Sequence, residues 1–128
     1  MKYLLDKQDN YTLIALEEDR LDSAVSPLLK SELVTLNAEG VRNMVLDLTK
    51  VKYTDSSGLS AILVANRICK DSGGTLAIAG ISDHTMKLIR LSQLEHVLNI
   101  VPTRDEAIEN VMLGDIEAEL RREGGMES

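Results

Sequence analysis

VLDLTKVKYTDSSG, residues 45–58, joins a buried-strand pattern to a cluster of small polar side chains. Residues 45–48 are mostly apolar without clean alternation, which is typical of a strand covered on both faces. Asp55, Ser56, Ser57 and Gly58 then stand where a helical pattern begins. Small side chains and free backbone N–H groups at a helix start favour a phosphate or another anion. We therefore expect one of these serines to carry the chemistry, as an acceptor and not as a catalyst.

Before this stretch, the sequence predicts a hairpin and one amphipathic helix. β-prone runs at residues 3–6 and 11–16 flank a polar turn, and the charged residues 17–21 are expected to form a loop. Asp22, Ser23 and Ser26 are candidate N-caps for the helix, Pro27 favours a start close by, and Gly40 is its expected end. The inward face of this helix is predicted to carry Val25, Leu29, Leu33 and Leu36.

After the motif, helix and strand patterns alternate. The motif opens a helix to about residue 71, a strand follows at residues 76–79, and a helix capped by Ser82 or Asp83 comes next. A weak edge strand at residues 98–101 precedes a last helix, which Thr103 and Glu106 open as a capping box. The inward residues of the last two helices are predicted to be Met86, Ile89 and Leu91, and Ile108, Val111 and Met112.

This order of elements predicts an α/β fold with a single mixed β-sheet, antiparallel at its start and parallel afterwards, and about four packed helices. Residues 1–113 are expected to form one domain, and residues 114–128 a C-terminal extension of mixed acidic and basic charge, partly helical or frayed. Gly114 is expected to end the last helix, or Asp115 to cap a short continuation. Ile116 and Leu120 can dock on the domain or on a second chain, so a monomer and a weak homodimer both stay open.

The overall composition argues against several classes of partner. The chain of 128 residues carries 21 acidic and 14 basic side chains, a formal charge of −7, which disfavours nucleic acid and anionic membranes. No run approaches the roughly 20 apolar residues of a membrane span, and nothing at the start resembles a signal peptide, so we expect a cytoplasmic protein. Cys69, the single cysteine, is expected to be a small core residue.

The helix that follows the motif has an unusual outer side. Leu59 and Leu63 fall among polar positions, next to Ser57 and Ser60, which indicates a contact surface. A neighbouring helix that covers both leucines is the alternative. The face expected to be core comprises Ala61, Val64, Ala65, Ile68 and Cys69. Together with the loop before the first helix, the expected partner surface comprises Asp22, Leu59, Ser60, Leu63 and Arg67.

The run from Val45 through Asp55-Ser56-Ser57-Gly58-Leu59 resembles the signature of the anti-sigma factor antagonists, the bacterial STAS domains. Weaker agreement comes from residues 21–22, from Gly73-Gly74 before the strand at 76–79, and from residues 103–107 at the start of the last helix. The resemblance covers about residues 2–113 and implies a STAS-like fold.

This resemblance implies a phosphorylation switch. Ser57, immediately before the glycine, matches the serine that an ATP-dependent anti-sigma factor kinase phosphorylates in the family. The unphosphorylated antagonist binds that kinase and frees the sigma factor, and a metal-dependent phosphatase resets the switch. ATP belongs to the kinase, so no cofactor is expected here. Asp55 is expected to orient the acceptor or hold the loop, Ser56 to cap or support it, and Gly58 to let another backbone approach.

Other functions need residues that this sequence does not cluster. Serine hydrolysis requires a base and an oxyanion hole, and an elbow of the G-x-S-x-G kind is absent. His84 and His96, the only candidate bases, are interpreted as surface residues, so we expect no enzyme. Metal ligand spacing is missing too, and an Asp47 or Asp55 phospho-acceptor would need a clustered acidic site. Within the same fold, the alternative is a STAS scaffold or transport-system component that binds other proteins without a Ser57 switch.

Overall fold

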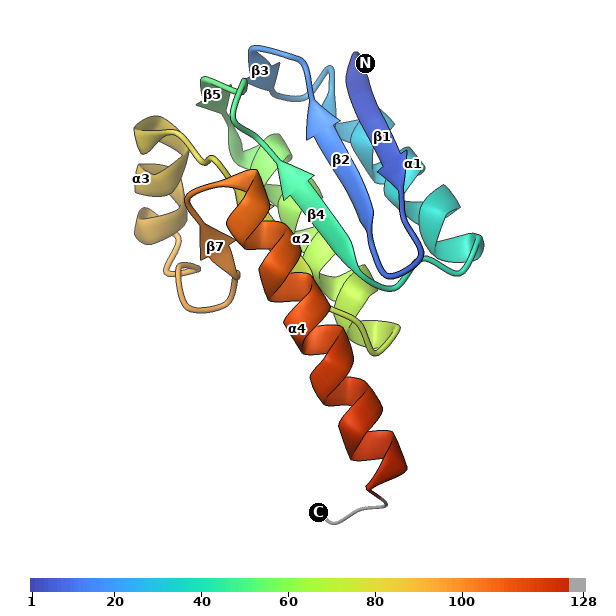
Figure 1. The fold of residues 1–128 in the computed structure, drawn as a ribbon. Coiled ribbons are helices and arrows are strands. Elements are labelled where there is room, and N and C mark those ends of the chain that lie inside the picture. The colour runs from blue at the N-terminus through green and yellow to red at the C-terminus, as the bar shows by residue number, and fades with distance from the viewer. Residues whose placement is uncertain (125–128) are drawn as a thin grey trace.

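A five-stranded sheet forms the centre of the computed structural model, which describes residues 1–124 (Figure 1). Its strands lie in the order β1 (Tyr3–Lys7), β2 (Thr12–Leu16), β4 (Met44–Asp47), β6 (Leu76–Ala79) and β7 (Ile100–Val101). β1 pairs antiparallel with β2, and each later pair in this sheet is parallel. The predicted mixed sheet, antiparallel at its start and parallel afterwards, is therefore confirmed.

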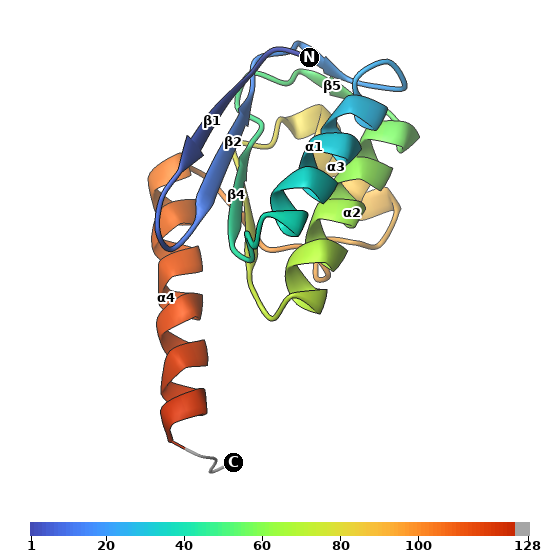
Figure 2. The same cartoon turned by 90° about the vertical axis from the view of Figure 1, so that its right-hand side faces the viewer.

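Helices cover both faces of this sheet (Figures 1 and 2). α1 (Ser26–Ala38), α2 (Ser56–Asp71) and α3 (Asp83–Leu91) lie on one face, and α4 (Arg104–Glu123) lies on the other. Leu46 of β4 is buried in the core beneath α1 and α2, whereas its neighbour Val45 is buried with Ala107 and Val111 of α4. β4 is thus covered on both faces, as its apolar pattern predicts.

A second, two-stranded sheet positions the starts of α1 and α2. β3 (Arg20–Leu21) lies in the segment 17–21, for which the sequence predicts a loop, and pairs in parallel with β5 (Tyr53–Thr54). That prediction is wrong because strands of two residues are too short to show an alternating pattern. β3 leads into α1 and β5 leads into α2, so their pairing brings the two helix starts together.

α1 begins without a side-chain cap, contrary to the prediction. Its N-cap is Val25, which makes no capping hydrogen bond, and Pro27 lies in the first turn. The Asp22 carboxylate instead accepts hydrogen bonds from the N–H groups of Ala24 and Val25 in the preceding turn, at 3.0 and 3.3 Å. The inward face is confirmed for Leu29, Leu33 and Leu36, which are all buried.

α4 continues without a break through Gly114 and Asp115, where the sequence predicts either its end or a newly capped continuation. A Cβ on Gly114 would lie 2.7 Å from Thr75 Oγ1, so the glycine lets the helix pack closely against the segment that leads into β6. Asp115 then accepts a hydrogen bond from Asn43 Nδ2 at 3.1 Å and pairs with Arg42 at 3.5 Å. The predicted boundary between residues 113 and 114 therefore falls inside one continuous helix.

The predicted inward faces of α3 and α4 hold only in part. Ile89 and Val111 are fully buried, but Leu91 is 75% exposed and Met112 is 37% exposed. The buried face of α4 contains Ala107, one turn before Val111, in place of the predicted Met112. Small Ala107 and Gly114 let α4 lie close to the sheet, and such a seam carries little hydrophobic signal in the sequence.

The C-terminal half of α4 projects beyond the sheet (Figures 1 and 2). Ile116 and Leu120 lie on this projecting part and are 53% and 62% exposed, so they do not dock on the domain.

None of the helices within residues 1–124 combines the length and the hydrophobicity that a membrane-spanning helix needs.

Candidate functional site

The motif lies where β5 passes directly into α2. Asp55 is the N-cap of α2 and accepts a hydrogen bond from the Gly58 N–H at 3.0 Å. Asp55 therefore takes the capping role that the sequence analysis gave to Ser56. Ser56 is exposed and Ser57 is half-buried, so the two hydroxyls have different surroundings although they are adjacent.

Gly58 holds the start of α2 against β3. A Cβ at this position would lie 2.2 Å from the Leu21 carbonyl oxygen and 2.7 Å from the Thr54 methyl group. Only glycine fits this approach, because a carbonyl oxygen of the backbone cannot swing aside as the end of a side chain can. The expectation that Gly58 admits another backbone is confirmed, and that backbone belongs to the same chain.

A buried pair of hydroxyls fixes the motif from the other side. Thr85 Oγ1 of α3 donates to Thr54 Oγ1 of β5 at 2.9 Å, and both residues are almost completely buried. The Thr85 N–H in turn donates to Ser82 Oγ, the N-cap of α3. Sequence reasoning missed this contact because the two threonines lie 31 residues apart.

α1 and α2 enclose a groove at their N-terminal ends. We call it the serine groove, and it is lined by Ser23, Ser26, Pro27, Lys30, Ser56, Ser57 and Ser60. Ser57 and Ser60, predicted together as parts of the site, both line it. Asp22 lies just before it and pairs with Arg20 at 3.5 Å. The sequence analysis did not foresee Lys30, because nothing in the motif indicates which face of α1 will lie beside it.

The predicted apolar extension of the site is wrong for Leu59. Leu59 is only 7% exposed and belongs to the main core, while Leu63 is partly buried against that core and Arg67 is exposed. α1 packs along α2, and the buried residues of α2 include both Leu59 and Ile62. Leu59 is therefore a core residue and not part of an exposed contact surface.

Cys69 lies on the same buried side of α2, as predicted. It is 1% exposed, and burial raises the pKa of its thiol to about 12. The thiol therefore stays protonated at neutral pH and is no nucleophile.

An aromatic stack flanks the motif on the α3 side. The Arg20 guanidinium lies 4.2 Å above the Tyr53 ring, and the Tyr53 and His84 rings are 4.9 Å apart. These three side chains come from β3, β5 and α3, so the stack links the small sheet to α3. Sequence reasoning predicted His84 as a surface residue, which its exposure confirms, but not its contact with Tyr53.

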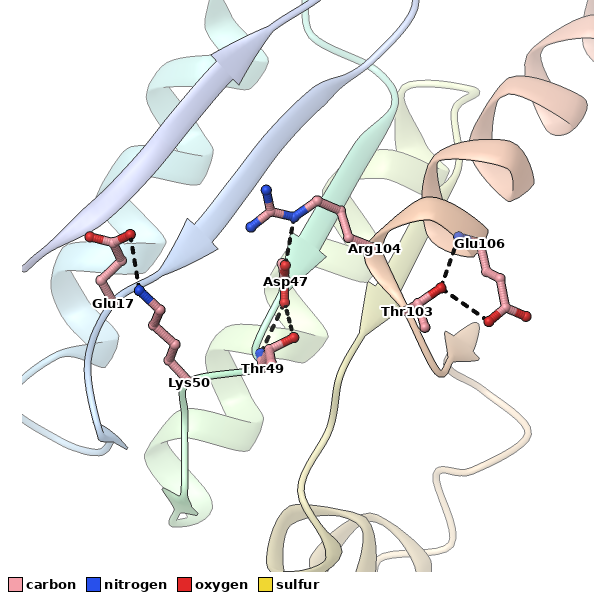
Figure 3. A network of polar contacts seen from close by, with 7 residues as sticks. All are labelled: Glu17, Asp47, Thr49, Lys50, Thr103, Arg104 and Glu106. Atoms are coloured by element: carbon pink, nitrogen blue, oxygen red, sulfur yellow. Dashed lines mark hydrogen bonds and ion pairs between the residues drawn. The ribbon is translucent and has the colours of Figure 1, made fainter.

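A second polar cluster lies on the α4 face of the sheet, at the end of β4 (Figure 3). Asp47 is 5% exposed and accepts three hydrogen bonds, from Arg104 Nε at 2.8 Å, the Thr49 N–H at 2.9 Å and Thr49 Oγ1 at 2.5 Å. Burial raises the pKa of the Asp47 carboxyl, but the bonds from Thr49 and the Arg104 guanidinium outweigh burial and hold it below its usual value. Each oxygen of this carboxylate already has a partner within the chain.

Comparison with known protein families finds one match across most of the chain. The family model described as STAS domain matches residues 3–107. BtrV, a Bordetella bronchiseptica protein named as a candidate anti-sigma factor antagonist, is 28% identical over 107 residues, covering 84% of this chain and 91% of that protein. The anti-sigma-B factor antagonist of Bacillus subtilis is 28% identical over 80 residues, covering 62% and 72% of the two chains.

Solved structures share the same fold. A candidate anti-sigma factor antagonist from Thermotoga maritima has a TM-score of 0.76 at 22% identity, covering 86% of this chain and 94% of its own. The Bacillus anti-sigma factor antagonist SpoIIAA has TM-scores of 0.69 unphosphorylated and 0.68 phosphorylated, at 21% identity. These alignments cover 87% and 86% of this chain, and 98% and 99% of SpoIIAA.

Proposed function

Because this chain belongs to the STAS domain family, we propose that it is an anti-sigma factor antagonist switched by phosphorylation of Ser57. Its unphosphorylated form binds an anti-sigma factor that is also an ATP-dependent serine kinase, and this binding frees the sigma factor. Phosphorylation of Ser57 weakens the binding, and a serine phosphatase restores it. The relatives from Bordetella and Bacillus are named for the antagonist role, which supports the proposal.

The position of Ser57 is the observation that carries this proposal. Ser57 lies in the first turn of α2, at the rim of the body, and lines the serine groove. Gly58 and Asp55 fix the backbone on which it is mounted, so its hydroxyl is presented to a partner from a rigid element. A hydroxyl displayed in this way suits a phosphoryl acceptor.

Within residues 1–124, Ser57 has no histidine base beside it, which argues against a catalytic role. The residues that line the serine groove include no histidine. His84 is stacked on Tyr53, and His96 is an exposed residue outside the groove. A serine nucleophile needs an adjacent base to become reactive at neutral pH. The acceptor hydroxyl must therefore be activated by the kinase, which also brings the ATP.

The charge change on phosphorylation is large enough to act as a switch. A phosphoryl group adds about −1.5 to −2 charges and three acceptor oxygens. At a helix N-terminus that charge is tolerated by the fold. At a protein interface, a loss of about 1.4 kcal/mol already weakens binding tenfold. We expect phosphorylation to change partner binding much more than stability.

The proposed partner surface surrounds the serine groove. It comprises Asp22 before α1, and Ser60, Leu63 and Arg67 along α2. Leu59 is buried in the core and is not part of this surface. The stack of Arg20 and Tyr53 borders this surface at β3 and β5.

A phosphorylation assay tests the proposal. The protein is used to capture its partner from a lysate of the organism that encodes it, and mass spectrometry identifies the captured protein. That protein is then purified and incubated with ATP and the wild type, Ser57→Ala or Ser56→Ala. We expect phosphate on Ser57 in the wild type and in Ser56→Ala, and none in Ser57→Ala.

Ser56→Ala is the matched control, since it removes the neighbouring hydroxyl and leaves the acceptor intact. Capture of transporter subunits, with no phosphate on Ser57 from any captured protein, would contradict the proposal and favour the scaffold or transport alternative. Partner affinity of the phosphorylated protein, measured by calorimetry, completes the test. An affinity equal to that of the unphosphorylated form would exclude a switch.

A further inference from the structure

The serine groove lies at the N-termini of two helices at once. Ser26 and Pro27 come from the first turn of α1, and Ser56 and Ser57 come from the first turn of α2. Each helix start carries roughly half a positive charge from its peptide dipoles. The N–H groups of Ser56 and Ser57 also lack intrahelical acceptors, because they belong to the first turn. Backbone charge alone therefore makes the groove attractive to an anion.

Ser26 supplies an independent sign that the groove takes a ligand. Its side chain is 2% exposed, and its Oγ has no hydrogen-bond partner within residues 1–124. It does not cap α1, whose N-cap is Val25. A buried hydroxyl without a partner costs about 1–3 kcal/mol, so such groups are rare in folded proteins. A ligand oxygen in the groove would satisfy this hydroxyl.

Lys30 supplies the charge. It lies one turn after Ser26 on α1, is half-buried, and makes no ion pair with any residue between 1 and 124. None of the residues that line the groove is acidic, although the chain carries 21 acidic side chains. The two nearest carboxylates in sequence are engaged elsewhere: Asp22 with Arg20 and the turn before α1, and Asp55 with Gly58.

We propose that the serine groove is an intramolecular receptor for the phosphoryl group on Ser57. Lys30 pairs with the phosphoryl oxygens, and the Ser26 hydroxyl donates a hydrogen bond to them. This inference rests on the proposed function, since it concerns the modified form of the same serine. The transfer forms the Ser57 Oγ–P bond and breaks the bond between the γ-phosphorus and ADP, and the hydroxyl proton passes to the kinase.

This arrangement changes how the switch works. The phosphoryl group lies against the domain and fills the groove. The partner therefore can no longer use the groove for binding, and it also meets a new negative charge. Part of the added charge is neutralised by Lys30 and by the two helix starts. The phosphorylated state is thereby stabilised from within the chain, and the fold keeps its shape.

Phosphoserine placed at residue 57 by genetic code expansion tests this inference without a kinase. The second pKa of the phosphoryl group, ordinarily about 6, is followed by ³¹P NMR as a function of pH. Because Lys30 and the helix starts favour the dianion, we expect that pKa to fall by about 0.5–1 unit. Lys30→Gln should raise this pKa most of the way back to about 6, and Ser26→Ala should raise it by a smaller amount.

Two matched controls separate the groove from its surroundings. Phosphoserine at residue 105 also lies in the first turn of a helix, α4, but at an exposed position outside the groove, so its pKa should stay closer to 6 and ignore Lys30→Gln. Lys70→Gln removes an exposed lysine of α2 outside the groove and should change neither site. Equal titration of phosphoserine at residues 105 and 57 would overturn the inference even if the Lys30 variant failed to fold. Because no kinase is used, equal titration would overturn the phosphoryl receptor and would not affect the proposed function. A failed phosphorylation assay would contradict the proposed function and would not affect the NMR titration.

Discussion

Asp47 and Ser26 are both almost completely buried polar residues, but the chain treats them in opposite ways. Asp47, 5% exposed beneath α4, accepts three hydrogen bonds from Thr49 and Arg104 (Figure 3). Ser26, 2% exposed at the start of α1, has no partner within residues 1–124. A buried polar group that the chain satisfies supports the fold, and one that it leaves unsatisfied calls for a further partner, such as a water, an ion or a ligand. One domain thus contains a buried polar residue that stabilises the fold and another that the fold leaves without a partner.

The largest expected effect follows from removing the satisfied group. Asp47→Ala leaves the Thr49 N–H and the Arg104 guanidinium without their acceptor. We expect the free energy of unfolding to fall by about 3 kcal/mol, at the lower end for a broken buried pair, because the Arg104 side chain is 43% exposed. Urea unfolding measures the change. Asp115→Ala, which removes a more exposed carboxylate from α4, should cost about 1 kcal/mol. Equal losses for the two variants would contradict the distinction.

A somewhat smaller loss is expected from crowding the start of α2. In Gly58→Ala the new methyl group meets the Leu21 carbonyl, so β3 and α2 must separate, at a cost of about 2 kcal/mol. Gly114→Ala is the control, because its methyl group meets only the Thr75 side chain and the substitution favours the helix. Thermal unfolding should show a clear drop for the first variant and little change for the second. A stable Gly58→Ala protein would show that the small sheet does not fix the motif.

Acid should weaken the Asp47 cluster without removing any atom. The pKa of Asp47 is lowered in the folded protein, so its contribution to stability is present above the unfolded value of about 3.9 and is lost as the pH falls through the lowered folded value. The loss is expected to be smaller than that of Asp47→Ala, because the protonated side chain keeps its shape. Unfolding curves between pH 6 and pH 2 check it, with Asp47→Asn as the variant that should lack this part of the acid dependence.

The smallest effect is expected from removing the unsatisfied group. Ser26→Ala deletes a hydroxyl that makes no hydrogen bond, so stability should change by less than about 0.5 kcal/mol or rise slightly. Thr85→Val removes the hydroxyl that bonds Thr54 and should cost about 1 kcal/mol. Denaturant unfolding of the two variants compares an orphaned with a bonded hydroxyl directly. A larger loss for Ser26→Ala would show that its hydroxyl already has a structural role.

Local patterns predicted the elements of this fold, and distant contacts account for what they missed. Strand alternation and helix spacing depend on neighbouring residues, so the sheet and the inward face of α1 could be predicted. Leu59 is buried among residues from other parts of the chain, and α4 continues through Gly114, where it packs against Thr75. Neither contact has a signal in the segment that it concerns.

The candidate site divides in the same way. Ser57 and its capping surroundings lie within one short stretch, which a motif can reveal. Ser26 and Lys30 come from another helix and join the groove through the pairing of β3 with β5 and the packing of α1 along α2. Asp47 and Arg104 are likewise separated by 57 positions in the sequence.

The contact of Gly58 with the Leu21 carbonyl bears on how an enzyme would recognise Ser57 as a substrate. This contact holds the turn that carries Ser57 against a segment more than thirty residues away. The surroundings of the Ser57 hydroxyl therefore exist only in the folded chain. A synthetic peptide spanning residues 50–62 would have the same local sequence but would lack α1 and β3. Under the proposed function, a kinase for Ser57 would have to recognise a three-dimensional surface instead of a linear consensus, and would not modify the same motif in an unfolded segment.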